Sequence, residues 1–267
     1  HMEAGNRSFD ANVPEEINRK VVDHLADFNL VYTEHARRHL ISEGLNHRFI
    51  YVTGSPMLEV LNSKKAQIDA SNILTTLDLE QKKYFIVSVH REENVDNPDS
   101  LKKVVDCLNE LYDKYGYPVV VSTHPRTKSR LEKLNLDTNS RDIRFLKPFG
   151  FFDYNKLQKE AFCAISDSGT IAEESAMLDF PAVTIRQSIE RPEALDAGSI
   201  VLTGLKPDIV ISAVDLVVKE GELFTNREIP TEYKVENTSL RVLKLILGTA
   251  KLTNRWRNLE SFSRYEW

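Results

Sequence analysis

The stretch Phe162-Cys-Ala-Ile-Ser-Asp-Ser-Gly-Thr-Ile-Ala-Glu-Glu174 sets the pattern of the whole chain. Its first five residues predict a buried strand, which stops at Asp167 and turns at once into a helix. The first N–H groups of a helix lack partners and carry partial positive charge, so this turn predicts an anion site. An ordinary N-capped helix in a parallel sheet has the same pattern, and both interpretations stay open at this point.

The side chains of the turn favour a phosphate-bearing ligand. Ser168 and Thr170 supply hydroxyl groups, and Gly169 lets a phosphate approach the backbone. Glu173 and Glu174 follow one turn into the helix, and a carboxylate there can bind two hydroxyl groups of a ribose while the helix end holds its phosphates.

Apolar runs and helical patterns alternate on both sides of this stretch. Further strands are predicted at 84–90, 118–122, 143–146, 182–185 and 200–202, separated by helices. This order predicts an α/β fold with a right-handed, mostly parallel, doubly wound sheet. Residues 66–82 predict a polar helical connector without a strong apolar face, after a helix that begins near Ser55 and ends at Leu61. We therefore predict a first lobe over 1–65, a second over 66–238, and a helix and tail over 239–267 that pack back toward the first lobe.

The first lobe begins without a leading strand. The polar segment from His1 to Arg7 runs directly into a helix that starts at Pro14. An α/β lobe that opens in this way lacks its first elements, so we expect the first lobe to be N-terminally incomplete. This predicts that the 267-residue chain expressed alone is inactive or poorly folded.

Composition excludes several classes of protein. The net charge of -5 and the pI near 5.9 argue against a nucleic-acid partner. No apolar run approaches the roughly 20 residues of a membrane span, and no signal peptide is visible. Cys107 and Cys163 lie in apolar runs, as expected for reduced core thiols of a cytoplasmic protein. Neither a zinc spacing nor Gly-x-Gly-x-x-Gly occurs, so we expect no metal and no cofactor.

Polar side chains follow five strands of the second lobe. In an open parallel sheet, ligands bind beyond the carboxyl ends of the strands, so these residues are expected to gather there. His90 and Arg91 can hold phosphate, and Tyr154 or Phe152 can stack on a base, although an aromatic cluster is more often core. His124 and the segment 186–193 follow two further strands. In the first lobe, loop and helix-start positions carry charged side chains that are candidates for catalysis, although an acid at a helix start is more often a cap: Glu3, Arg7, Glu15 and Glu16.

Several motifs together resemble the non-hydrolysing UDP-N-acetylglucosamine 2-epimerase family. They occur in the family's order over almost the whole chain: His1-Met-Glu-Ala-Gly-Asn-Arg7, Pro14-Glu-Glu-Ile-Asn-Arg19, Thr53-Gly-Ser55, His90-Arg-Glu-Glu-Asn94, Ser166-Asp-Ser-Gly-Thr-Ile-Ala-Glu-Glu174 and Glu190-Arg-Pro-Glu193. Asn6, with Phe9 shortly after, is most similar to the branch that forms UDP-N-acetyl-L-fucosamine from its L-talo epimer. The resemblance implies two Rossmann-like lobes in a GT-B-like arrangement, with the nucleotide in the cleft between them.

The resemblance also implies a mechanism and a set of roles. UDP is eliminated from a UDP-activated 2-acetamido sugar and added back with inversion at C2, without NAD. Glu3 and Glu15 are implied as acid/base carboxylates and His90 as the group that assists departure of UDP. Arg91, Ser168, Gly169 and Thr170 would bind diphosphate, Glu174 the ribose, and Tyr154 would lie near uracil. Thr170 stands where relatives often have a second glycine.

A homodimer is the family's expectation. A glycosyltransferase, a binding module without catalysis and a hydrolytic relative remain alternatives to the epimerase.

Overall fold

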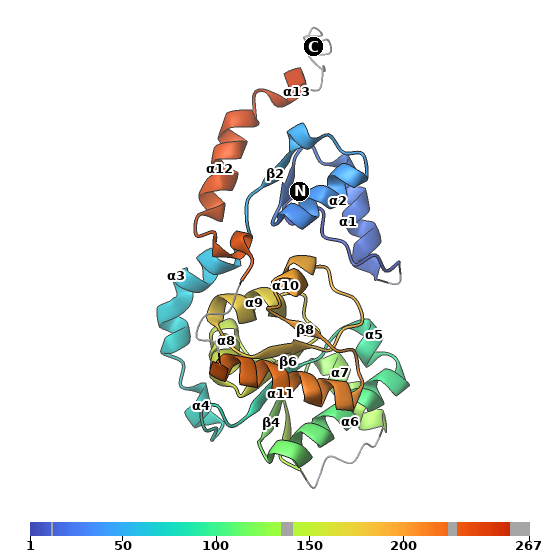
Figure 1. Ribbon diagram of the computed structural model, residues 1–267, viewed down its shortest axis with the longest axis vertical. Coiled ribbons are helices and arrows are strands. Elements are labelled where there is room, and N and C mark those ends of the chain that lie inside the picture. The colour runs from blue at the N-terminus through green and yellow to red at the C-terminus, as the bar shows by residue number, and fades with distance from the viewer. Residues whose placement is uncertain (12, 135–140, 224–228, 257–267) are drawn as a thin grey trace. The chain divides into compact units, whose positions relative to one another are not determined.

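The computed structural model of the protein describes residues 1–11, 13–134, 141–223 and 229–256 (Figure 1). The chain divides into two units. Unit 1 comprises His1–Val60 and Thr231–Trp267, and unit 2 comprises Leu61–Pro230. Each unit is described by itself below.

A six-stranded parallel sheet forms the centre of unit 2. Its strands are β3 (Phe85–Ser88), β4 (Val119–Ser122), β5 (Ile143–Leu146), β6 (Cys163–Ser166), β7 (Ala182–Thr184) and β8 (Val201–Leu202). They lie in the order β5-β4-β3-β6-β7-β8. Strand order reverses between β3 and β6, which pair with Ser88 opposite Ser166. This is the doubly wound order with its topological switch point, so the prediction of a doubly wound parallel sheet is confirmed.

Helices cover both faces of this sheet. They are α4 (Ile73–Thr76), α5 (Glu92–Val95), α6 (Pro98–Tyr115), α7 (Pro125–Leu134), α8 (Phe151–Glu160), α9 (Ile171–Leu178), α10 (Pro192–Asp196) and α11 (Pro207–Leu223). Strand side chains alternate between faces. Phe85 and Val87 therefore pack with α6 and α11, whereas Tyr84 and Ile86 pack with α4, α8, α9 and α10.

Unit 1 contains a two-stranded parallel sheet, β1 (Asn29–Val31) with β2 (Ile50–Val52). Its other elements are α1 (Pro14–Leu25), α2 (Glu34–Ser42), η1 (His47–Phe49), η2 (Thr231–Lys234), α12 (Thr238–Thr249) and α13 (Thr253–Trp256). Met2 forms an isolated parallel bridge with Leu30, which places the opening motif, residues 1–7, beside β1. A small core of Ala4, Val31, Ala36, Leu40 and Ile50 joins the N-terminal segment to β1, β2 and α2. The predicted packing of the C-terminal tail falls partly on 257–267, outside the described residues.

The predicted helix end at Leu61 was wrong. Helix α3 (Met57–Asp69) continues for two further turns, and Lys65 pairs with Asp69 four residues later on the same helix. The expectation that 66–82 lacks a strong apolar face left out the buried side chains of Ile68 and Ile73.

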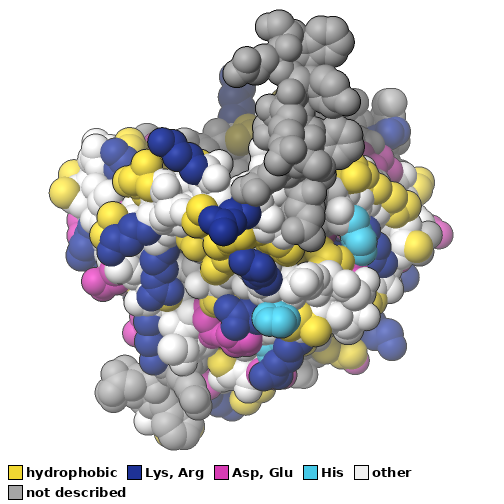
Figure 2. Space-filling model, turned by 90° about the horizontal axis from the view of Figure 1, so that it is seen from above, with side chains coloured by type: hydrophobic (Ala, Val, Ile, Leu, Met, Phe, Trp, Pro, Cys, Tyr) yellow, Lys and Arg dark blue, Asp and Glu magenta, His cyan; other side chains and the backbone are white. Residues whose placement is uncertain are grey.

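Charged groups are interspersed on the surface drawn in Figure 2, where Lys and Arg side chains lie among acidic and hydrophobic ones. No helix in the described ranges is both long and apolar enough to span a bilayer.

Candidate functional site

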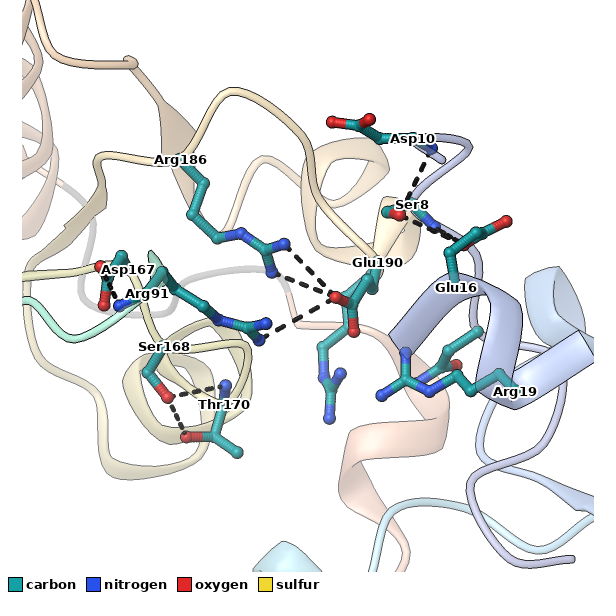
Figure 3. Close-up of polar contacts among 12 residues, drawn as sticks. Ser8, Asp10, Glu16, Arg19, Arg91, Asp167, Ser168, Thr170, Arg186 and Glu190 are labelled. Carbon is teal, nitrogen blue, oxygen red and sulfur yellow. Dashed lines mark hydrogen bonds and ion pairs between the residues drawn. The ribbon is translucent and has the colours of Figure 1, made fainter. Parts of the chain in front are cut away.

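The turn after β6 forms the predicted strand-turn-helix. The Ser168 N–H donates to Ser166 Oγ at 3.0 Å, and the Thr170 N–H donates to Ser168 Oγ at 3.3 Å. The hydroxyl groups of Ser168 and Thr170 lie 3.0 Å apart (Figure 3). Thr170 is the N-cap of α9 and makes no side-chain hydrogen bond to the helix backbone. The turn thus carries two hydroxyl groups at a helix N-terminus, where the dipole favours an anion.

Two guanidinium groups lie close to Gly169. A β-carbon added at this glycine would lie 3.6 Å from Arg91 Nη2 and 3.9 Å from Arg191 Nη1. Arg91 follows β3, and Arg191 comes from the loop after β7. A helix N-terminus flanked by two arginines next to a bare backbone matches the requirements of a diphosphate, since Arg binds phosphate in bidentate fashion.

Carboxylates hold these arginines in a buried network. Arg191 donates from Nε and Nη2 to Glu173 Oε2 at 2.9 and 2.7 Å. In Figure 3 the guanidinium groups of Arg91 and Arg186 both point toward Glu190. Arg186 donates to Glu190 Oε1 at 3.3 and 3.4 Å, and Arg91 Nη2 lies 3.9 Å from the same oxygen. These contacts are longer than the 2.7–2.9 Å of a strong charge-assisted hydrogen bond, so Glu190 holds the two cations loosely.

Glu174, the predicted ribose-binding residue, is engaged within unit 2. It accepts hydrogen bonds from Thr170 Oγ1 at 2.9 Å and from Gln158 Nε2 at 2.6 Å. Burial raises the pKa of Glu174, although these two donors oppose the shift. The carboxyl group is therefore oriented in advance by partners on α8 and at the start of α9.

Tyr154, predicted to lie near uracil, is partly buried against the core on the α8 side of the sheet. Burial raises the pKa of its hydroxyl, and hydrogen bonds with Ser88 and Ser166 partly oppose this rise. Its hydroxyl thus lies at the carboxyl ends of β3 and β6. The neighbouring Phe151 and Phe152 are 43% and 38% exposed, so they are the available stacking surfaces of α8.

The loop after β3 carries His90. Its backbone N–H donates to both carboxylate oxygens of Asp167 at 3.1 Å, and its ring Nδ1 lies 3.1 Å from Asp167 Oδ1. Asp167 is fully buried, whereas the side chain of His90 is 47% exposed. The two loops that meet at the switch point are therefore joined through one carboxylate.

Glu3 and Glu15 belong to unit 1. Asn6 Nδ2 donates to Glu3 Oε1 at 3.2 Å, and Arg19 Nη2 lies 3.3 Å from the same oxygen. Arg19 follows Glu15 by one helical turn on α1, so Glu3 and Glu15 are associated with the same helix face. The adjacent Glu16 is buried and accepts from the Ser8 N–H at 2.8 Å and the Ser8 hydroxyl at 3.1 Å.

Glu15 and Glu16, although adjacent, therefore lie in different environments. Glu16 fixes the loop before α1, and the donors from Ser8 and Lys20 lower its pKa despite burial. Glu15 is exposed in the first turn of α1. The assignment of Glu3, Glu15 and His90 as catalytic groups stays a prediction, because the two units are described separately.

Within unit 2, the predicted residues Arg91, Tyr154, Ser168, Gly169, Thr170 and Glu174 all lie at or beside the carboxyl ends of β3 and β6. Sequence reasoning assigned no role to Asp167, Arg186 or Arg191, which the structure brings to the same edge. The available signal was their position directly after strands. Among the described residues, no group of three or more His, Cys, Asp or Glu has the arrangement of a metal site.

Comparison with known proteins gives consistent results. Residues 1–247 match the family model described as UDP-N-acetylglucosamine 2-epimerase. A UDP-N-acetylglucosamine 2-epimerase of Methanocaldococcus jannaschii is 34% identical over 232 residues, which cover 85% of this chain and 63% of that protein.

Two solved structures are similar in fold as well. The UDP-N-acetylglucosamine 2-epimerase from Rickettsia bellii superposes with a TM-score of 0.88 at 42% identity, covering 96% of this chain and 68% of that one. The M. jannaschii enzyme, solved in complex with UDP-GlcNAc and UDP, gives a TM-score of 0.84 at 31% identity, covering 93% and 68%. The chain thus spans about two thirds of the length of these relatives. The chain belongs to the UDP-N-acetylglucosamine 2-epimerase family.

Proposed function

We propose that the protein is a nucleotide-sugar 2-epimerase that inverts C2 of a UDP-2-acetamido sugar. The observation that carries the proposal is Gly169, with the guanidinium groups of Arg91 and Arg191 beside it at the N-terminus of α9. This arrangement supports binding of a diphosphate at the switch point of the sheet. Family membership supplies the reaction type.

The proposed reaction requires strong stabilisation of the leaving UDP. Removal of the C2 proton leaves an electron pair that forms a C1–C2 double bond. The C1–O bond breaks, and its electrons leave with the β-phosphate oxygen of UDP. Positive groups that are fixed before the reaction stabilise this charge without reorganisation. Arg191, held by Glu173, is such a group. UDP then adds back to C1, and C2 receives a proton on the opposite face.

The two faces of C2 require separate acid/base groups. We assign these roles to Glu3 and Glu15 of unit 1. Glu16, held by two hydrogen bonds from Ser8, is assigned to fixing the loop before α1. Arg19 and Asn6 support the orientation of Glu3.

We make more specific proposals for the substrate sugar, the cellular compartment and the oligomeric state. Asn6 and Phe9 favour a 6-deoxy-L-hexosamine for surface polysaccharide synthesis, and UDP-GlcNAc or UDP-ManNAc is the alternative. We further propose a cytoplasmic homodimer. Cys107 and Cys163 are buried and form no disulfide within the described residues, which is compatible with a reducing compartment.

Incubation with UDP-2-acetamido sugars in deuterated water tests the proposal, with the protein in a form as long as its relatives, because the 267-residue chain alone is expected to be inactive. Deuterium at C2 with inversion, followed by NMR, is the expected result. Transfer to an acceptor without C2 exchange would replace the epimerase by a glycosyltransferase, and release of free sugar with UDP would replace it by a hydrolase. Thermal stabilisation by UDP without any exchange would indicate a binding module.

Gly169→Ala tests the diphosphate site separately. The added methyl group meets the two arginines at ordinary contact distances of 3.6 and 3.9 Å, so folding should be unaffected. It occupies the space where a phosphate would approach the backbone. Loss of one charge-assisted hydrogen bond, about 1.5–3 kcal/mol, predicts UDP binding weaker by about 10–100-fold in calorimetry. The matched control is Gly150→Ala at the N-cap of α8, where an added methyl group meets no atom within 4 Å. Equal UDP affinity in both variants would contradict the assignment.

A further inference from the structure

The carboxylate of Asp167 is the most heavily hydrogen-bonded group at the switch point. It accepts from the backbone N–H groups of His90 and Arg91 and from Asn94 Nδ2, at distances of 2.9–3.1 Å. Its own N–H donates to Ser88 O at 3.2 Å. The carboxylate therefore holds the loop after β3 against the end of β6.

One contact of Asp167 goes beyond building this loop. His90 Nδ1 lies 3.1 Å from Asp167 Oδ1, so the carboxylate faces one ring nitrogen of the histidine. Nε2 makes no hydrogen bond within the part of the chain that the structure describes, and the imidazole is 47% exposed. The Nδ1 edge of the ring is therefore held against Asp167, whereas the Nε2 edge has no such contact within the described residues.

Asp167 is ionised in this environment. Burial alone would raise its pKa, but the hydrogen bonds and charge of His90, together with the donors from Asn94 and Arg91, lower it below the usual value. An anionic carboxylate 3.1 Å from a ring nitrogen requires a proton on that nitrogen. The neutral ring then carries its proton on Nδ1.

We propose that Asp167 is the positioning residue for His90, which it holds in the Nδ1–H form so that Nε2 faces the diphosphate. The proposal deepens the proposed function and rests on it. When His90 is protonated, Nε2–H is shared with the β-phosphate oxygen that takes the electron pair of the breaking C1–O bond. When UDP adds back to C1, the proton is again held on Nε2. Asp167 stabilises the imidazolium and stays ionised throughout, as carboxylates do for other catalytic histidines.

The competing explanation is that Asp167 only builds the loop. Asn94 offers a matched control, because Asn94→Ala removes a donor to Oδ2 at 3.0 Å and leaves the contacts of His90 with Oδ1. A purely structural role predicts similar behaviour for Asp167→Asn and Asn94→Ala. A positioning role predicts that only Asp167→Asn changes the state of the histidine ring.

The first measurement is long-range ¹H–¹⁵N NMR of the ligand-free protein at alkaline pH, with the His90 signal identified by its loss in His90→Gln. The wild-type protein should show the Nδ1–H tautomer. The Nε2–H tautomer in the wild-type protein would overturn the proposal, whether or not any variant folds. In Asp167→Asn the tautomer should change or become mixed, and in Asn94→Ala it should stay Nδ1–H.

The second measurement is steady-state kinetics of C2 epimerisation. General acid–base assistance contributes typically 10²–10⁴-fold, so kcat of Asp167→Asn should fall by about 100-fold or more, with KM changed less than about threefold. Asn94→Ala should lose less than about tenfold. Equal losses in the two variants, or a loss in KM alone, would overturn the positioning role. If the wild-type protein, in the form as long as its relatives, shows no C2 exchange, the proposed function fails, while the tautomer still decides the pairing of Asp167 with His90.

Discussion

Replacement of Arg7 by Met should destabilise unit 1 far more than is usual for a residue in a loop. The Arg7 side chain is fully buried and donates from Nε and Nη2 to Glu43, both at 2.7 Å. Nη2 also lies 2.8 Å from the fully buried Asp23, and Nη1 donates to Asn6 O at 2.9 Å. One guanidinium thus joins the opening motif to α1 and to the end of α2.

The expected loss of stability follows from the partners that Asp23 retains when Arg7 is absent. Without Arg7, the partners that Asp23 keeps among the described residues are His1 Nδ1 at 2.6 Å and the Gly5 N–H at 3.1 Å. Breaking a buried ion pair by removing one partner costs about 3–5 kcal/mol. Burial already raises the pKa of Asp23. A raised folded-state pKa favours the native state at lower pH, so the deficit of Arg7→Met should shrink as pH falls and the carboxyl takes up a proton.

Urea unfolding monitored by Trp256 fluorescence in a Trp267→Phe background measures the loss. Trp256 packs edge-on against Phe28 and lies under Arg48, all within unit 1. With a slope of about 2 kcal/mol per M, the midpoint should fall by about 1.5–2.5 M. The control is Arg37→Met on α2, whose exposed pair with Glu34 at 3.1 Å should contribute less than about 1 kcal/mol. Losses within about 1 kcal/mol of each other in the two variants would refute the reasoning.

Two further outcomes follow from local geometry. Gly5 has φ +76, and a β-carbon there would lie 2.4 Å from Ala36 O, so Gly5→Ala should cost about 2–5 kcal/mol in urea unfolding. Gly44→Ala, with φ +88 but open space, should cost only about 1–2 kcal/mol, and equal losses would contradict this account. Lys159 and Lys65 lower the pKa of Asp69 to about 2, so its contribution to stability should be complete above the unfolded pKa and lost as pH falls toward 2. Carboxyl ¹³C NMR of Lys159→Met should show a higher Asp69 midpoint, and an unchanged one would contradict the role of this pair.

The glycine of the opening motif illustrates how far sequence can explain a residue. Sequence analysis recognised Glu3, Gly5 and Arg7 as parts of one motif but gave no physical reason for Gly5 and Arg7. The structure gives both reasons, since Gly5 approaches the α2 backbone and Arg7 neutralises buried carboxylates from two helices. These partners lie between 16 and 36 residues away along the chain, beyond the range of local pattern.

The connector over residues 66–82 is a case in which local composition did not predict burial. The polar composition of 66–82 predicted a segment without an apolar face, yet Ile68 and Ile73 are buried. Ser71 donates to Asp153 at 2.6 Å, and Lys159 pairs with Asp69 at 2.8 Å, which ties the segment to α8. Leu74, Leu77 and Leu79 of the same segment also pack, partly buried, against the core that contains Leu157 of α8. These apolar side chains do not stand out as one helical face in the sequence, and their burial depends on the surface that α8 provides.

The sequence by itself determined the alternation of strands and helices, the doubly wound class of the sheet and the strand-turn-helix at Ser168, Gly169 and Thr170. Each of these depends on neighbours within one or two turns of chain, where periodicity and backbone preference act. Only the tertiary structure decided that Asp167 meets His90 across 77 residues and that Arg191 meets Glu173 beside Gly169. Strand order places those groups together, and strand order is fixed by the packing of both sheet faces rather than by any local stretch of sequence.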